Sequence, residues 1–191
     1  MSINQRLLTD PAARPTPTEP PLTTATDDGL KRRAAALQSM AVLDTPPDEG
    51  FDAVTRLASS VCQTPIAIVS LIDGERVWFK SVQGLSVTAI ENRHSFCCEA
   101  ANSKCLLEVS NARLDPRFAN NALVTGELGI LYYAGAPIMY EGVGIGTVCV
   151  LDRAPRELAH QSRLALQELA KIATALLRAR IEAFSFYSST R

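Results

Sequence analysis

The chain has 191 residues and a mass of 20.6 kDa, enough for one domain with a sizeable core but not for two of ordinary size. Its 19 Lys and Arg against 20 Asp and Glu leave a net charge of −1, which provides no basic surplus to hold a nucleic-acid backbone. No apolar run reaches the roughly 18 residues of a membrane span, and residues 1–10 lack the apolar stretch of an export signal. We therefore expect a cytosolic protein without a nucleic-acid or membrane partner.

The cysteines indicate free thiols. There are five, so they cannot all pair within one chain, and none stands in a Cys-x-x-Cys motif. This usage favours neither a disulfide framework nor a metal site, and His94 has no companion at metal-ligand spacing.

Residues 1–28, rich in proline and threonine, are expected to form a disordered or polyproline-like leader without a core of its own. Five of the eleven prolines fall there, and each removes a backbone donor and favours extended geometry in the residue before it. Two helices follow the leader. Asp27–Gly29 can cap the first, whose apolar residues recur every three or four positions from Leu30 until Thr45–Pro47 ends it. The second begins at Asp48, with acidic residues in its first turn.

Two β-hairpins are predicted, one on each side of a long irregular stretch. Residues 65–73 are apolar almost throughout and rich in branched side chains, which favours a strand covered on both faces. The Asp73-Gly74 step supplies a tight turn into a strand at 76–82. Residues 131–137 and 145–152 flank a second, glycine-containing turn. Helices packed on these antiparallel strands define an α+β domain.

Residues 83–130, between the hairpins, show little periodicity beyond a short strand at 106–109 and a helix start at Asp115. Long irregular excursions in compact domains usually serve as binding loops or lids. From Pro155 a last helix carries apolar residues at three- and four-residue spacing, which is typical of a short coiled-coil seam. The seam consists of Leu158, Ala165, Leu169, Ile172, Leu176 and Ala179.

A series of motifs in order resembles the GAF family of small-molecule-binding sensory domains. The motifs are LDTPP at 43–47 with Phe51-Asp52, PIAIVSLID at 65–73, WFKS at 78–81, SFC at 95–97, DPRF at 115–118, YYAGAP at 132–137 and GTVCVLD at 146–152. The resemblance covers residues 31–181 and is greatest to the branch that precedes histidine-kinase or diguanylate-cyclase output domains.

The resemblance implies a GAF-like, profilin- or PAS-like antiparallel sheet. The N- and C-terminal helices would cover one face, and a ligand pocket would lie on the other, roofed by residues 83–130. The domain would span residues 29–184, with a tail at 185–191. The implied function is sensing of an unidentified small molecule, relayed to a signalling partner by terminal helices that also form a homodimer. No output domain is expected, because only one helix follows Asp152.

Nine residues on these motifs are candidates for ligand contact. They are Ser95, Phe96, Cys97, Arg117, Phe118, Tyr132, Tyr133, Thr147 and Cys149. Strand alternation puts the two tyrosines on opposite faces and leaves open which of them faces the pocket. The same rule puts Ile145, Thr147, Cys149 and Leu151 on one face of their strand.

Several candidates also have a purely structural interpretation. Ser95 can cap a helix or hold an anionic group at the same helix start. Cys97 can be a small buried hydrophobe, a pocket wall or a redox thiol. The Asp115-Pro116 step suits a helix opening. Arg117 can pair with that aspartate or with Glu127, or can grip a carboxylate or phosphate.

Two other functions stay open beside regulatory sensing. The domain can be a ligand-free dimerisation or protein-interaction module, or a thiol-dependent reductase of free methionine sulfoxide, an activity of one GAF branch. No enzymatic activity is expected in the preferred interpretation. A covalent bilin is not expected, because bilin-bearing relatives carry a histidine after the attachment cysteine, whereas Cys97 and Cys98 precede Glu99. Haem would have only His94 as an axial ligand, and the residue set of cyclic-nucleotide binders is missing.

Overall fold

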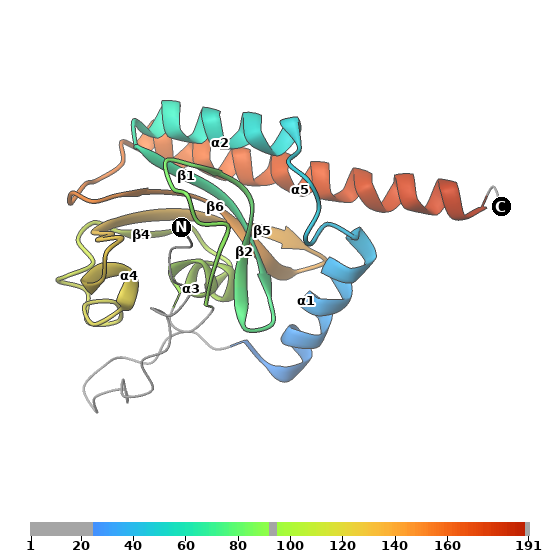
Figure 1. The fold of residues 1–191 in the computed structure, drawn as a ribbon, viewed down its shortest axis with the longest axis horizontal. Coiled ribbons are helices and arrows are strands. Elements are labelled where there is room, and N and C mark those ends of the chain that lie inside the picture. The colour runs from blue at the N-terminus through green and yellow to red at the C-terminus, as the bar shows by residue number, and fades with distance from the viewer. Residues whose placement is uncertain (1–24, 92–94, 190–191) are drawn as a thin grey trace, which may run out of the picture.

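The structure is a computed structural model that describes residues 25–91 and 95–189 (Figure 1). Within these residues one antiparallel sheet has the strand order β3-β2-β1-β6-β5-β4. The strands are β1 (Ile66–Asp73), β2 (Arg76–Gln83), β3 (Ala89–Glu91), β4 (Leu107–Val109), β5 (Tyr132–Tyr140) and β6 (Val143–Asp152). The helices are α1 (Asp27–Met40), α2 (Glu49–Cys62), α3 (Phe96–Ser103), α4 (Ala122–Thr125) and α5 (His160–Ser189). The predicted α+β fold around an antiparallel sheet is confirmed.

Both predicted hairpins form, and together they make the centre of the sheet. β1 turns into β2 through Gly74, whose φ of 56° suits a residue without a Cβ. β5 turns into β6 through Glu141 and Gly142, with φ values of 48° and 75°. Two successive positive φ values are the signature of the type I′ turn, whose twist matches that of the paired strands. β1 then pairs with β6 and joins the two hairpins.

The two faces of the sheet are covered by different parts of the chain. Helices α1, α2 and α5 cover one side, here called the helical face, where α2 and α5 run side by side (Figure 1). Near the start of α5, the Ser162 hydroxyl donates to the carbonyl of Val61 near the end of α2, at 3.1 Å. The other side, here called the roof face, is covered mainly by the stretch between the hairpins. Because both sides are covered, β1 and β6 are buried almost along their whole length.

The helix boundaries follow local capping. Asp48 caps α2 as predicted, its carboxylate accepting from the N–H of Gly50 at 2.9 Å. Thr26 caps α1, one residue before the predicted cap. That helix ends at Met40, where Ala41 takes a left-handed φ of 44°, and not at the Thr45–Pro47 step. The leader lies outside the described residues up to residue 24, and α5 continues to Ser189.

A β-bulge changes the predicted alternation on β6. The register of β5 and β6 shifts after Ile138, which leaves Ile145 as the extra residue. Ile145 therefore packs in the core of the helical face, and the prediction that it shares a face with Thr147 is wrong. Cys149 and Leu151 lie on the roof face, as expected of this set.

The predicted seam on the last helix is mostly directed toward the molecule's own core. Helix α5 begins at His160 rather than near Pro155, and Leu169 is only 6% exposed. Of the six seam residues, only Ile172 and Ala179 are exposed. The helix packs on the sheet through a stripe that consists of Leu166, Leu169, Ala170, Ala173 and Leu177.

Candidate ligand site beneath the roof segment

The roof segment, residues 83–91 and 95–130, places α3 against the strands β5 and β6. Ser95 caps α3 by accepting from the N–H of Cys97 at 3.1 Å, so the predicted capping role is confirmed. The first turn of α3 then presents Phe96 to the sheet. The Phe96 ring lies 4.3 Å from the Phe118 ring and 5.0 Å from the Tyr133 ring, measured between centroids.

This aromatic stack fills most of the space where the ligand pocket was expected. The cavity between roof and sheet has a volume of about 20 Å³. It is lined by apolar side chains together with Ser95 and Cys97. A cavity of this size has room for about one water molecule. The roof is therefore present as predicted, but in this conformation it encloses no space for a ligand of several atoms.

The two tyrosines have different environments. Tyr133 faces the roof and is fully buried. Tyr132 lies on the helical face and donates its hydroxyl to the Glu108 carboxylate at 3.2 Å, so the structure places it outside the candidate site. Gly135 provides room for Tyr133, because a Cβ there would lie 2.1 Å from the Tyr133 hydroxyl oxygen.

A small polar cluster lies beneath the roof. The Ser70 and Thr147 hydroxyls are 2.8 Å apart, and the Cys97 and Cys149 sulfurs are 3.9 Å apart. The Tyr133 hydroxyl is buried without a hydrogen-bond partner among the described residues. Burial raises the pKa of Tyr133, so its hydroxyl is a neutral donor at physiological pH.

Arg117 is held by protein carboxylates. Its side chain forms a fork with Asp115, with nitrogen–oxygen distances of 3.0 and 2.6 Å, and lies 3.6 Å from a Glu99 oxygen. The pairing of Arg117 with Asp115 is as predicted. The second carboxylate beside the guanidinium is that of Glu99, and not that of Glu127. The predicted helix at Asp115 is a single turn, in which the Asp115 carbonyl accepts from the N–H groups of Phe118 and Ala119.

Seven of the nine candidates gather between roof and sheet. They are Ser95, Phe96, Cys97, Phe118, Tyr133, Thr147 and Cys149. Ser70 belongs to the same cluster but was not among the candidates, although it is the one polar residue within the apolar stretch 66–72. Glu99 was noted only as a departure from relatives, and its ion pair with Arg117 crosses between two parts of the roof that sequence spacing does not connect.

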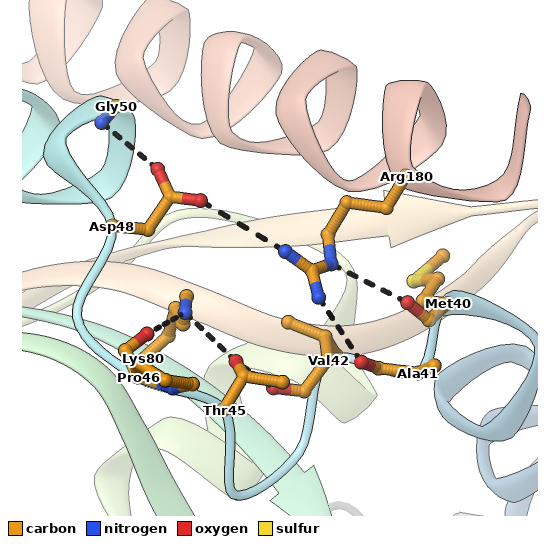
Figure 2. A network of polar contacts seen from close by, with 9 residues as sticks. All are labelled: Met40, Ala41, Val42, Thr45, Pro46, Asp48, Gly50, Lys80 and Arg180. Atoms are coloured by element: carbon orange, nitrogen blue, oxygen red, sulfur yellow. Dashed lines mark hydrogen bonds and ion pairs between the residues drawn. The ribbon is translucent and has the colours of Figure 1, made fainter. Parts of the chain in front are cut away.

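A second polar network joins α5 to the linker between α1 and α2 (Figure 2). Arg180 donates to the carbonyls of Met40 and Ala41, at 3.4 and 3.1 Å, and lies 3.9 Å from the Asp48 carboxylate. The same linker also contacts β2. The buried Lys80 ammonium on that strand donates to the Thr45 hydroxyl and the Pro46 carbonyl, at 2.9 and 2.7 Å. Burial lowers the pKa of Lys80. These contacts fix the linker to both α5 and β2.

A larger hollow lies outside the candidate site. It is an open groove of about 570 Å³ between α5, the part of β5 beyond its pairing with β4, and Lys104–Leu106. Its lining includes Lys171 and Arg178 but none of the nine candidate residues.

Comparison with known proteins agrees with this architecture. The profile of the GAF domain matches residues 46–177. A cyclic di-GMP phosphodiesterase of Pseudomonas aeruginosa is 40% identical over 145 residues, which are 75% of this chain and 25% of that protein. The chain therefore belongs to the GAF family. It spans a quarter of the phosphodiesterase's length.

Solved structures show the same fold. The GAF domain of an Acinetobacter phosphoenolpyruvate-protein phosphotransferase has a TM-score of 0.60 at 16% identity and covers 81% of this chain and 95% of its own. A free methionine-R-sulfoxide reductase from Neisseria meningitidis, solved with its substrate, has a TM-score of 0.59 at 19% identity, covering 84% and 96%.

Two further observations concern membranes and metals. No helix among the described residues is long and apolar enough to cross a membrane. The same residues contain no group of three or more His, Cys, Asp or Glu side chains placed to hold a metal ion.

Proposed function

We propose that this GAF domain is a regulatory module of a signalling protein and acts by self-association through the helical layer of α2 and α5. Apolar side chains exposed on these two adjacent helices carry the proposal: Leu57 is 52%, Val61 42%, Leu164 44% and Ile172 48% exposed. Single exposed apolar residues are ordinary on protein surfaces. Four large ones lie on two helices that pack side by side, and a second copy related by a twofold axis would cover apolar surface there, here called the patch.

Contacts between the roof segment and α5 supply a route by which a change beneath the roof reaches this layer. Glu108, on β4, accepts from the backbone N–H of Leu158 at 2.7 Å and from the Arg163 guanidinium at 2.6 Å. β4 belongs to the roof segment, whereas Arg163 lies in the first turn of α5. Movement of the roof segment would therefore displace Glu108 and change its contacts at the start of α5.

The relationship to the phosphodiesterase supports a regulatory role. Since this chain matches only a quarter of that protein, the match concerns one part of a longer polypeptide. We propose no catalytic step for the chain itself. A reductase needs a thiol that its substrate can reach in the site. The two candidate thiols, Cys97 and Cys149, lie beneath a cavity for about one water molecule, and the exposed Cys105 lines the open groove outside the candidate site.

Sensing of a small molecule is the second candidate, and the Tyr133 hydroxyl favours it. A buried hydroxyl without a partner is costly, and a ligand that accepted its hydrogen bond would be favoured. Such a ligand would have to displace Phe96 or Phe118, because their rings occupy the space next to Tyr133.

Sedimentation velocity tests the assembly proposal. Wild-type chain should sediment as a dimer at micromolar concentration, and Ile172→Glu and Leu57→Glu should sediment as monomers, because a carboxylate on the patch would be desolvated. Leu114→Glu is the matched control, because Leu114 is 79% exposed in the roof segment and should leave the dimer intact. A monomeric wild type, or dimers unaffected by both patch variants, would reject assembly through this layer.

A further inference from the structure

Two thiols from distant parts of the chain meet beneath the roof. Cys97 lies in the first turn of α3 and Cys149 in the middle of β6, and both are buried. Their sulfurs are 3.9 Å apart, close to van der Waals contact. A disulfide requires about 2.05 Å, so a movement of about 2 Å would join them.

The surroundings favour reaction at one sulfur of the pair. The contact with Cys149, together with the hydroxyls of Thr147 and Ser70, lowers the pKa of Cys97 against the opposing effect of burial. Burial raises the pKa of Cys149. One sulfur thus tends toward the thiolate, the reactive form, while its neighbour keeps its proton.

Access to the pair is restricted by size. Cys97 lines the cavity of about 20 Å³, which admits only molecules near the size of water. Hydrogen peroxide belongs to this class, whereas glutathione disulfide and other small-molecule disulfides are far larger.

We propose that Cys97 and Cys149 form a peroxide-oxidisable pair that closes into a disulfide between α3 and β6. The Cys97 sulfur attacks one peroxide oxygen, the O–O bond breaks, and the departing hydroxide takes up the proton that Cys97 gave up and leaves as water. The Cys149 sulfur then attacks the Cys97 sulfenic acid. The S–S bond forms, the S–O bond breaks, and hydroxide leaves with the Cys149 proton as a second water. Two thiols are oxidised and one peroxide is reduced to two waters.

The other cysteines provide internal controls. Cys98 is adjacent in sequence, but burial raises its pKa to about 12. Cys62 lies in the core of the helical face, and burial raises its pKa to about 11. Cys105 is exposed and should react with any oxidant without selectivity. The proposed pair does not depend on self-association, because both sulfurs belong to one chain.

The test is mass spectrometry of native protein treated with hydrogen peroxide and then blocked with an alkylating reagent. Cys97 and Cys98 fall in one tryptic fragment, so the Cys98→Ser variant is used. We expect a linked peptide containing Cys97 and Cys149, two hydrogens lighter than its reduced components and lost on treatment with dithiothreitol. It should persist in Cys105→Ser and disappear in Cys97→Ser and Cys149→Ser.

Three results would overturn the proposal. The first is absence of the linked peptide at peroxide doses that oxidise Cys105. The second is formation of the link only in urea, and the third is a Cys97 link to Cys105 instead. The linked peptide from the Cys98→Ser protein is the primary readout, so the proposal remains testable even if the Cys149→Ser variant fails to fold.

Discussion

At the scale of single residues, Arg117 shows how an apparent ligand-binding group can serve the fold. Its side chain is 26% exposed and connects the Asp115 turn to Glu99 on α3, with the Cζ atom 5.0 Å from the Phe118 ring centroid. The fork with both oxygens of Asp115 uses the geometry that distinguishes arginine from lysine. We therefore assign Arg117 to the internal cohesion of the roof segment.

Replacing Arg117 by alanine should lower the free energy of unfolding by about 2 kcal/mol, because charged hydrogen bonds to Asp115 are lost. Arg117→Lys should recover only part of this loss. Chemical denaturation of both variants measures the effect. An Arg117→Ala protein as stable as wild type would contradict the assignment.

The same pair predicts a pH dependence. The hydrogen bonds from Arg117 hold the pKa of Asp115 below its usual 3.8. A carboxyl with a depressed folded-state pKa contributes stability above its unfolded pKa and loses it as pH falls through the folded value. The difference in stability between wild type and Arg117→Ala should therefore be larger at about pH 7 than at about pH 2. A constant difference would indicate that the ion pair is not its source.

At the scale of secondary-structure elements, α5 has two faces with different roles. Leu169 is buried against the sheet, whereas Ile172, three residues later, is exposed. Spacing alone put both on one seam, because it records which residues recur but not which side the rest of the chain covers.

Glutamate at these two positions should separate the roles. Leu169→Glu buries a charge without a partner and should cost several kcal/mol, enough to unfold the chain or lower its melting temperature sharply. Ile172→Glu should change monomer stability by about 0.5 kcal/mol or less. Thermal melts followed by circular dichroism at low protein concentration measure both effects. Similar melting temperatures for the two variants would contradict the orientation of α5, in which Leu169 faces the sheet and Ile172 faces away from it.

Local chemistry in the sequence predicted the hairpins, the start of α2 and the cap of α3. Asp48 and Ser95 each cap a helix through a hydrogen bond to a backbone N–H only two residues later, and each glycine-containing turn is formed within four residues. The end of α1, the bulge at Ile145 and the filling beneath the roof were not predicted. The left-handed cap that ends α1 is local, but it stands on Ala41 rather than on the glycine that is usual there. The bulge and the filling depend on partners more distant in the sequence, as when Phe96 stacks on Tyr133.

At the scale of the whole molecule, the sheet separates a tightly packed roof face from a helical face with exposed apolar side chains. Glu108 connects the roof to the start of α5, and Arg180 connects the later part of α5 to the linker after α1 (Figure 2). In the function that we propose, regulation would be a change in how α2 and α5 pack against a second copy, in response to small changes beneath the roof.

A thermal-shift screen of small anions, amino acids and nucleotides tests most directly whether the roof face is filled. A ligand that binds only the folded chain, present at about 100 times its Kd, would raise the melting temperature by roughly 5–10 °C for a domain of this size. We predict no such shift for any molecule larger than a few atoms. A dose-dependent rise that is lost in the Tyr133→Phe variant would contradict the account and establish a ligand receptor beneath the roof.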